Sequence, residues 1–320
     1  MKSVIFLGGN SGSPQTAEWH AWRQMGIGSS DAIILAAEEG VVKAPSWVKN
    51  SRWLWEVKTG RRSGEIPSNA AMQRGTLNEA PARDSFIKRT GIQVSPMFGG
   101  NDGHPFIRAS FDGIDFNQEV LVEIKVPSFE RHSAAKSGVV PEYYLVQMAH
   151  QALVLWEHPD CFDGKNANYV SYYPETDDLA IVDQVNTGGF DVPLISCLKP
   201  IAQRLLEIEK CFWDSVRNET LPCGTEWVVL VREYLAAEAE INIWKEKAGQ
   251  AKERLINLLG NKAKEVGGGI TMSRVSKNGS IDYPALLKTH LPDFPESELE
   301  KFRKSGSETF MIRKYEDPEN

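Results

Sequence analysis

Hydrophobic residues recur every three or four positions in several long stretches of the chain, the spacing that places them on one face of a helix. This pattern covers residues 19–37, where a glycine turn interrupts it, and residues 69–90, 143–157, 193–218 and 226–259. Shorter runs rich in Val, Ile and aromatic residues have the character of strands. These runs are residues 92–94, 106–112, 119–126, 167–173 and 179–185.

The order of these elements predicts an α/β core built on a mixed sheet. Residues 113–117 should form a turn that joins strands 106–112 and 119–126 into a hairpin. The helices over 193–218 and 226–259 are separated by a short loop with Pro222 and Gly224, so we expect an antiparallel helical hairpin. The predicted domains are a core over residues 1–190, and over residues 191–320 the hairpin with an α/β extension packed on that core.

Composition narrows the class of protein. The chain has 320 residues, 41% of them hydrophobic, and a formal net charge of −7. No apolar run approaches the roughly 18 residues of a membrane helix, and the first nine residues are too short an apolar stretch for a secretory signal. We therefore expect a cytoplasmic protein without a membrane partner. The acidic balance argues against non-specific coating of nucleic acid, although it leaves room for a local basic channel.

The four cysteines and six histidines show none of the spacings that are typical of zinc sites or disulfide frameworks. A catalytic metal should therefore have oxygen ligands.

The turn from Gly26 to Asp31 has the features of an anion-binding site. Ser29, Ser30 or Asp31 is the expected N-cap of the helix that follows. The backbone N–H groups of the turn and the helix N-terminus would then point towards a bound anion. The alternative is a plain helix cap beside a surface cation.

A second informative segment lies on the predicted hairpin. Side chains alternate along a strand, so Glu123 and Lys125 share one face while Val122 and Ile124 occupy the other. Asp112 on the neighbouring strand can reach Glu123 across the hairpin. Two converging carboxylates and a backbone carbonyl form a site suited to Mg²⁺. Taken alone, the same pattern also fits an interstrand salt bridge on an exposed edge.

Residues from about Trp22 to Tyr173 resemble the lambda-exonuclease and YqaJ-like viral recombinase nucleases of the PD-(D/E)xK superfamily, which include phage-type alkaline exonucleases. The glycine turn through Ser30 and Asp31 is similar to the first motif of that family. Its second motif, G-x-x-x-E-x-x-A-R, matches Gly75 to Arg83. The S-P-D-G and E-x-K-x-P motifs match residues 110–113, with Phe in place of Pro, and residues 123–127.

The resemblance implies a restriction-endonuclease-like mixed sheet flanked by helices and a magnesium-dependent nuclease, with Mn²⁺ as a substitute ion. In that family the residues that correspond to Asp112 and Glu123 bind metal, and the Ile124 carbonyl is a further ligand. Glu79 would assist a second ion. Lys125 would orient and polarise the attacking water.

A downstream glutamine also belongs to the family site. The usual Q-x-Q motif is incomplete here, because Gln147 is followed by Met148 and Ala149, and the next glutamine is Gln151. Gln147 is the predicted catalytic glutamine.

The family pocket for a 5′-phosphate corresponds to Arg23, Ser30 and Ser110, which agrees with the independent interpretation of the glycine turn as an anion site. Ser110 lies two residues from Asp112, so the pocket and the metal should be neighbours.

The resemblance further implies 5′-to-3′ digestion of one strand of linear double-stranded DNA to mononucleotides. The product would be a 3′ single strand for an annealing recombinase, and the enzyme would be a ring-shaped homotrimer. Two alternatives stay open. One is a sequence- or structure-specific endonuclease of the same superfamily, and the other is a non-catalytic module that binds DNA ends.

Overall fold

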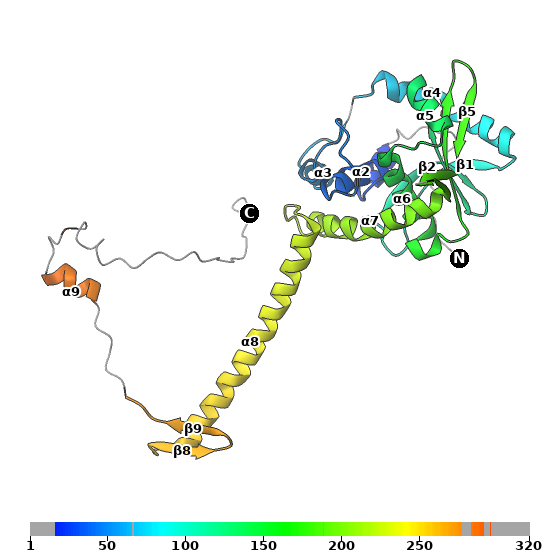
Figure 1. The fold of residues 1–320 in the computed structure, drawn as a ribbon. Helices are drawn as coiled ribbons and strands as arrows, with labels where there is room; N and C mark the ends of the chain where they lie inside the picture. The colour runs from blue at the N-terminus through cyan, green and yellow to red at the C-terminus, as the bar shows by residue number, and fades with distance from the viewer. Residues whose placement is uncertain (1–16, 66, 188, 277–282, 291–294, 296–320) are drawn as a thin grey trace. The chain divides into compact units, whose positions relative to one another are not determined.

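The structure, a computed structural model, describes residues 17–65, 67–187, 189–276, 283–290 and 295 (Figure 1). The chain divides into two compact units, Met1–Glu240 and Ile241–Asn320. The first unit carries the sheet and the predicted site. The first nine residues, on which the expectation of no secretory signal rests, lie outside the described part.

A five-stranded mixed sheet forms the centre of the first unit, as the pattern predicted. Its strands have the order β1-β2-β3-β4-β5, and only β3 and β4 are parallel. They are β1 Val94–Gly100, β2 Arg108–Asp115, β3 Val120–Lys125, β4 Asn166–Tyr173 and β5 Asp178–Val182.

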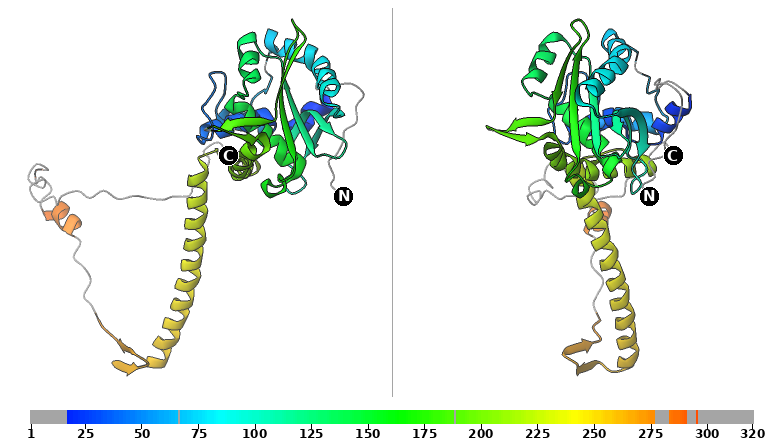
Figure 2. Two further views of the ribbon diagram at one scale, coloured as in Figure 1. Left: turned by 45° about the vertical axis from the view of Figure 1, so that its right-hand side comes forward. Right: turned by 90° about the vertical axis from the view of Figure 1, so that its right-hand side faces the viewer.

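Helices cover both faces of this sheet (Figures 1 and 2). One face packs on α4 through Phe86, Val122 and Ile124, and the other packs on α6 and α7 through Leu121 and Leu153. The helices of this unit are α1 Ala17–Gln24, α2 Ser29–Glu38, α3 Ser51–Lys58, α4 Ala70–Thr90, α5 Phe129–Lys136, α6 Glu142–Trp156 and α7 Leu194–Arg217. The opposite environments of Leu121 and Val122 confirm the alternation expected along β3.

The hairpin of β2 and β3 differs from the prediction in the position of its turn. Strand β2 continues to Asp115, so Asp112 lies inside the strand and not at its end. Between β1 and β2 the register shifts, because the pairs Ser95↔Ile114 and Met97↔Phe111 leave one extra residue on β2. Such a bulge increases local twist and changes the direction of nearby side chains. The bulge therefore falls at the predicted metal ligand Asp112.

The boundary between the two compact units falls after Glu240, and α7 packs on the predicted core of residues 1–190. Leu194, Leu198 and Leu205 on this helix are fully buried against the α6 face of the sheet. The expected antiparallel pairing of α7 with α8, Thr225–Leu259, stays a prediction, because α8 runs across the boundary between the two units. Most large apolar side chains of α8 are exposed, whereas Val228 and Val231 are half-buried and Leu259 is buried.

Short elements complete the described chain. They are the 3₁₀ turn η1 Pro159–Cys161, the two-stranded ribbons β6 Gln184–Thr187 with β7 Phe190–Pro193 and β8 Lys264–Gly267 with β9 Ile270–Ser273, and helix α9 Tyr283–His290. Among the described helices, none combines the length and apolar character needed to cross a membrane.

Candidate active site

The site is built where strands β2 and β3 separate. Their backbone pairing consists of Gly113↔Val122 and Ile114↔Leu121 and does not extend to Asp112. There the Asp112 carboxylate takes the place of a backbone acceptor, since the Ile124 N–H donates to its Oδ2 at 2.8 Å. Gly113 allows this geometry, because a Cβ at its position would lie 3.0 Å from Val94 Cγ2 and 3.3 Å from Val122 Cβ. The bulge thus fixes Asp112 beside the backbone of β3.

Glu123 and Lys125 project from β3 on the face covered by α6. Glu123 has no exposed surface, and its Oε1 contacts the Lys125 ammonium. The Lys125 side chain retains 22% of its surface, and its Nζ lies 5.0 Å from the ring centre of Tyr144. Lys125 is therefore placed between the buried carboxylate and solvent.

Burial and neighbouring charges shift the pKa values of the groups in this cluster. Burial, together with the negative charge of Asp112, raises the pKa of Glu123 to about 7, although Lys125 opposes the shift. Burial alone would lower the pKa of Lys125, but Glu123 and Asp112 raise it above its ordinary value. The two carboxylates repel each other, and Lys125 remains an ammonium.

A buried glutamine on α6 holds Glu123 from the other side. Gln151 Nε2 donates to Glu123 Oε2 at 2.6 Å and to the Ser110 carbonyl at 3.0 Å. Gln147 lies one helical turn earlier and is half-buried. Within the described residues its side chain makes no hydrogen bond. The structure therefore brings Gln151 to the cluster and leaves the predicted Gln147 outside it. The family spacing favoured Gln147, whereas the i, i+4 position of Gln151 on the same helix face was the available signal.

Glu79 lies on α4 and is linked to the cluster by Arg83. Arg83 Nη2 donates to Glu79 Oε1 at 2.5 Å, and its Nε donates to the Asp112 carbonyl at 2.6 Å. Burial and the charge of Asp112 raise the pKa of Glu79, while Arg83 and Lys125 oppose the shift. Sequence reasoning included Arg83 in a motif but gave it no role. Its role here is to connect the α4 carboxylate to the backbone of the β2 bulge.

The glycine turn packs against the start of β2. Ile27 N–H donates to the Phe106 carbonyl at 2.6 Å, and Arg108 N–H donates to the Ile27 carbonyl at 2.9 Å. A Cβ on Gly26 would lie 2.6 Å from the Phe106 oxygen, so only glycine permits this approach. The turn is thus attached to the strand that carries Asp112.

The N-cap of α2 is Gly28, and the predicted caps Ser29, Ser30 and Asp31 lie within the helix. The Asp31 carboxylate accepts from the Gly28 N–H at 3.0 Å, so this donor is not directed at an external anion. Asp31 also pairs with the buried Lys58 ammonium at 2.7 Å, a contact that the sequence did not predict. Burial raises the pKa of Asp31, but Lys58 and Arg23 reverse the effect and hold it below its ordinary value.

Two of the three predicted phosphate ligands are in contact. Arg23 Nη2 donates to Ser30 Oγ at 2.7 Å, and Ser30 is exposed. Ser110 is exposed on β2, and no hydrogen bond among the described residues joins its hydroxyl to Arg23 or Ser30. The structure therefore assembles the Arg23 and Ser30 pair and places Ser110 separately.

A family model for the YqaJ-like viral recombinase domain matches residues 18–156, which contain every residue described above. Residues 18–156, less than half of the chain, are thus similar to a YqaJ-like viral recombinase domain. A relative from Bacillus subtilis (strain 168), the uncharacterized protein YqaJ, is 30% identical over 140 residues, which are 43% of this chain and 42% of the relative. The chain thus matches less than half the length of this curated relative.

Two solved structures are also similar to the chain. An alkaline exonuclease, LHK-Exo, from Laribacter hongkongensis is 25% identical, with 64% of this chain and 98% of that one covered and a TM-score of 0.44. A phage related exonuclease from Haemophilus somnus 129PT is 14% identical, with 61% and 96% covered and a TM-score of 0.38.

The region that matches the family model has carboxylates that fit a divalent cation. Asp112 and Glu123 offer hard oxygen ligands, and the pKa of Glu123 is raised by burial and, to a smaller extent, by repulsion from Asp112 that a cation would relieve. In the part of the chain that the structure describes, no three His, Cys, Asp or Glu side chains are grouped closely enough to hold a metal ion. Glu79 is instead bound by Arg83. Asp112 and Glu123 are therefore the two carboxylates here that fit a cation, and Glu79 would have to leave Arg83 to join them.

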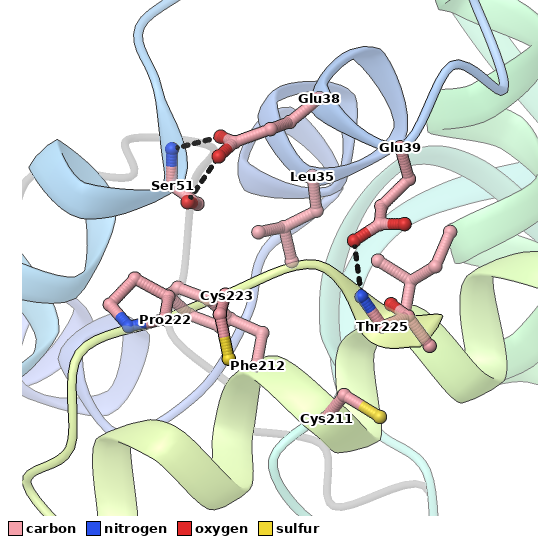
Figure 3. Close-up of a pocket in the computed structure, with 10 residues that line it drawn as sticks. Leu35, Glu38, Glu39, Ser51, Cys211, Phe212, Pro222, Cys223 and Thr225 are labelled. Atoms are coloured by element: carbon pink, nitrogen blue, oxygen red, sulfur yellow. Dashed lines mark hydrogen bonds between the residues drawn. The ribbon is translucent and has the colours of Figure 1, made fainter. Parts of the chain in front are cut away.

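A separate pocket lies beside the C-terminal end of α2 (Figure 3). Glu38 accepts hydrogen bonds from the backbone N–H and hydroxyl of Ser51, at 2.6 and 2.8 Å, and Glu39 accepts from the Thr225 N–H at 2.8 Å. These carboxylates satisfy the first N–H groups of α3 and α8, which have no partner within their own helices. Since its polar groups are already paired, this pocket serves helix capping.

Proposed function

We propose that the YqaJ-like domain is a nuclease that hydrolyses DNA with Mg²⁺, for which Mn²⁺ can substitute. The observation that carries this proposal is the convergence of Asp112, Glu123 and Lys125 at the point where β2 and β3 separate. A structural ion pair would need one carboxylate for Lys125. Burial is the main cause that raises the pKa of Glu123 to about 7, and the second carboxylate adds a repulsion that a bound cation would relieve.

Each residue has a distinct role in this proposal. Asp112 and Glu123 would hold the ion, with the Ile124 carbonyl as a further ligand. Gln151 fixes the orientation of Glu123 through its 2.6 Å hydrogen bond. When bound, the metal lowers the pKa of water and stabilises charge on the phosphate. Lys125, which stays protonated and faces solvent, would donate a hydrogen bond to the attacking water and orient it towards the scissile phosphate.

The proposal includes a second metal ion, but only under a condition on when it binds. Glu79 is its proposed ligand and now pairs with Arg83 at 2.5 Å. A phosphate group near Arg83 would compete for its guanidinium and release Glu79. We therefore propose that a second ion binds only together with DNA.

The proposed substrate is linear double-stranded DNA, digested from 5′ to 3′ on one strand to mononucleotides. The contact of Arg23 with Ser30 supports a pocket for the terminal 5′-phosphate, because guanidinium and hydroxyl donors are suited to phosphate oxygens. Ser110 is proposed as the third member of this pocket and would contact DNA from β2.

The wider assignment rests on the resemblance alone. It proposes a ring-shaped homotrimer in the cytoplasm, a viral or phage role in recombination, and an annealing recombinase that takes the 3′ strand. The catalytic domain in this assignment is the core that the sequence predicted over residues 1–190.

The deciding experiment compares linear and supercoiled circular duplex DNA, each with Mg²⁺ or with EDTA. We expect acid-soluble nucleotides from the linear DNA in Mg²⁺ only, and an intact circle. Cleavage of the circle would favour the endonuclease alternative. Binding of linear ends without release of nucleotides in Mg²⁺ or Mn²⁺ would favour the non-catalytic module. The variant Asp112→Asn, which keeps the shape of the side chain, is the matched control for contaminating nucleases.

A further inference from the structure

Helix α8 carries a regular apolar stripe whose side chains are exposed among the described residues. Starting at Trp227, every seventh residue of the helix is apolar. The same is true of every seventh residue starting at Leu230. The first set is Trp227, Tyr234, Ile241, Ala248 and Leu255, and the second is Leu230, Ala237, Trp244, Ala251 and Leu258. These are the a and d positions of five consecutive heptads, the repeat of a coiled-coil seam.

The seam is open to solvent along the whole helix. All ten of its residues are exposed; Trp227 retains 65% of its surface, Trp244 66% and Leu258 79%. A helix of 35 residues is stabilised mainly by packing of its apolar face, and exposed apolar stripes of this kind mark interaction sites. The stripe is therefore suited to a partner helix.

Charges beside the seam identify that partner. In the first half of α8 the charged e and g positions are acidic, namely Glu233, Glu238 and Glu240, and the remaining e position is Val231. In the second half they are basic, and they hold Lys245, Lys247, Lys252 and Arg254. Flanking charges determine partner and orientation in coiled coils. A helix that is acidic at one end and basic at the other is complementary to a second copy of itself that runs in the opposite direction.

We propose that α8 pairs with α8 of a second copy of this chain as an antiparallel coiled coil. In an antiparallel pair, a and d positions share layers, and g positions face g positions. One register places Trp227 with Leu258, Leu230 with Leu255, Tyr234 with Ala251, Ala237 with Ala248, and Ile241 with Trp244 of the other copy. The same register pairs Glu233 with Arg254, and Glu240 with Lys247. All ten seam residues and every g–g pair within the helix are then matched.

The parallel alternative is poorer in charge and in shape. Of its three charged pairs, only Glu240 with Lys245 has opposite charges, whereas Glu233 lies beside Glu238 and Lys247 beside Lys252, which are like charges. It would also place Trp244 against Trp244, which would force the helices apart. The next two layers would each contain only alanine and would leave a gap between the helices. The antiparallel register combines Trp244 with Ile241 and Tyr234 with Ala251, which evens the volume of the layers.

The test measures the mass of the full-length protein by light scattering at tens of micromolar, with Ile241→Glu and its matched control Ile243→Glu. These isoleucines retain 50% and 53% of their surface, but only Ile241 lies in the seam. We expect Ile241→Glu to halve the assembled mass, from six chains to three if the core forms a trimer or from two to one if it does not. Ile243→Glu should leave the mass unchanged. A single-chain mass for the parent protein, or equal effects of the two variants, would overturn the proposal.

Orientation is tested by disulfide formation between two differently tagged copies in which the exposed Cys161 and Cys223 are replaced by serine. A mixture of Glu233→Cys and Arg254→Cys copies should form a mixed disulfide. A mixture of Glu233→Cys and Glu238→Cys copies should not, because these positions adjoin only in a parallel pair. The opposite result would overturn the antiparallel arrangement. Both tests are independent of nuclease activity, so they can fail while the proposed function stands.

Discussion

Gln151 Nε2 lies 2.6 Å from Glu123 Oε2 and donates a hydrogen bond to a carboxylate that has no exposed surface. The same amide nitrogen binds the Ser110 carbonyl. One side chain on α6 therefore fixes the position of a buried acid on β3 relative to the backbone of β2. Hydrogen bonds to charged groups contribute about 1.5–3 kcal/mol. Gln151 thus ties together the two strands that carry the candidate ligands.

This contact predicts different roles for two glutamines on one helix. We expect Gln151→Ala to lower the rate of nucleotide release by roughly ten- to a hundredfold, because Glu123 loses its orienting donor. Gln147→Ala should change the rate by less than about threefold. Both rates are measured on linear duplex DNA in Mg²⁺, with circular dichroism as the test of folding. A larger loss in Gln147→Ala than in Gln151→Ala would restore the glutamine that the family spacing favours.

Substitutions of the three charged residues Asp112, Glu123 and Lys125 should have different effects on metal binding and on catalysis. Lys125→Ala should reduce hydrolysis by roughly a hundred- to a thousandfold, since it removes the group that positions the water. Its Mg²⁺ affinity in calorimetry should not fall, because an ammonium is not a metal ligand. Asp112→Ala and Glu123→Ala should lose both activity and Mg²⁺ binding. Lys136→Ala, which removes a lysine that pairs with Asp178, is the control. Full activity of Lys125→Ala would assign Lys125 a structural role.

The contact between Arg23 and Ser30 predicts a preference for phosphorylated ends. Initiation on 5′-phosphorylated duplex should fall roughly ten- to a hundredfold in Arg23→Ala, the loss expected for one charge-assisted contact. On 5′-hydroxyl ends the same variant should change little, because the phosphate partner is already missing. Arg52→Ala, an exposed arginine that pairs with Glu56, serves as control. An equal loss on both kinds of end would place Arg23 in general backbone contact or in folding.

A buried pair on α6 and α7 should make stability depend on pH. His150 Nδ1 lies 2.7 Å from Glu209 Oε1, and its Nε2 lies 2.8 Å from the Arg108 carbonyl, so both ring nitrogens face acceptors. Burial would lower the pKa of His150, but Glu209, the Arg108 carbonyl and Asp31 raise it above its ordinary value. A raised folded-state pKa stabilises the fold fully below the unfolded value of about 6.5, and the stabilisation is lost as pH rises through the folded-state pKa.

The corresponding experiment compares the parent protein with Glu209→Gln by urea denaturation from pH 6 to 9. The difference in unfolding free energy should decrease as pH rises above about 6.5, by about 1.4 kcal/mol for each unit that separates the two pKa values of His150. The variant keeps the shape of the side chain and removes the charge. A difference that stays constant over this range would mean that His150 is neutral in the folded protein.

Most elements of the core were predictable because each has a local signal. The period of the apolar residues located α4, α6 and α7, and the alternation along β3 placed Glu123 and Lys125 on one face. The bulge at Asp112 was not predictable, since it depends on the pairing of β2 with β1, which no local pattern encodes. Helix α5 was missed because its eight residues include only one large hydrophobic residue, Phe129, which is exposed.

In the candidate site, too, residues with a local sequence signal were predicted and contacts between distant residues were not. Asp112, Glu123 and Lys125 were found from strand alternation and from motifs that lie close together in the sequence. The contacts of Arg83 with the Asp112 carbonyl and of Lys58 with Asp31 join residues 29 and 27 positions apart. Such contacts depend on how helices cross the sheet. For α8 the apolar period correctly predicted a helix but not its partner, because a helix stripe does not specify whether its own chain covers it.

Residues at both ends of helix α2 make hydrogen bonds to other parts of the chain, and these contacts fix the length of the helix. Its N-terminal end carries Ser30 in contact with Arg23, and its C-terminal end carries Glu38 and Glu39, which bind Ser51 and Thr225. Each residue of an α-helix advances the chain by about 1.5 Å and rotates it by about 100°. One inserted or deleted residue within α2 would therefore turn both glutamates away from the helices that they cap. Related chains should accept substitutions along α2 far more readily than a change in its length.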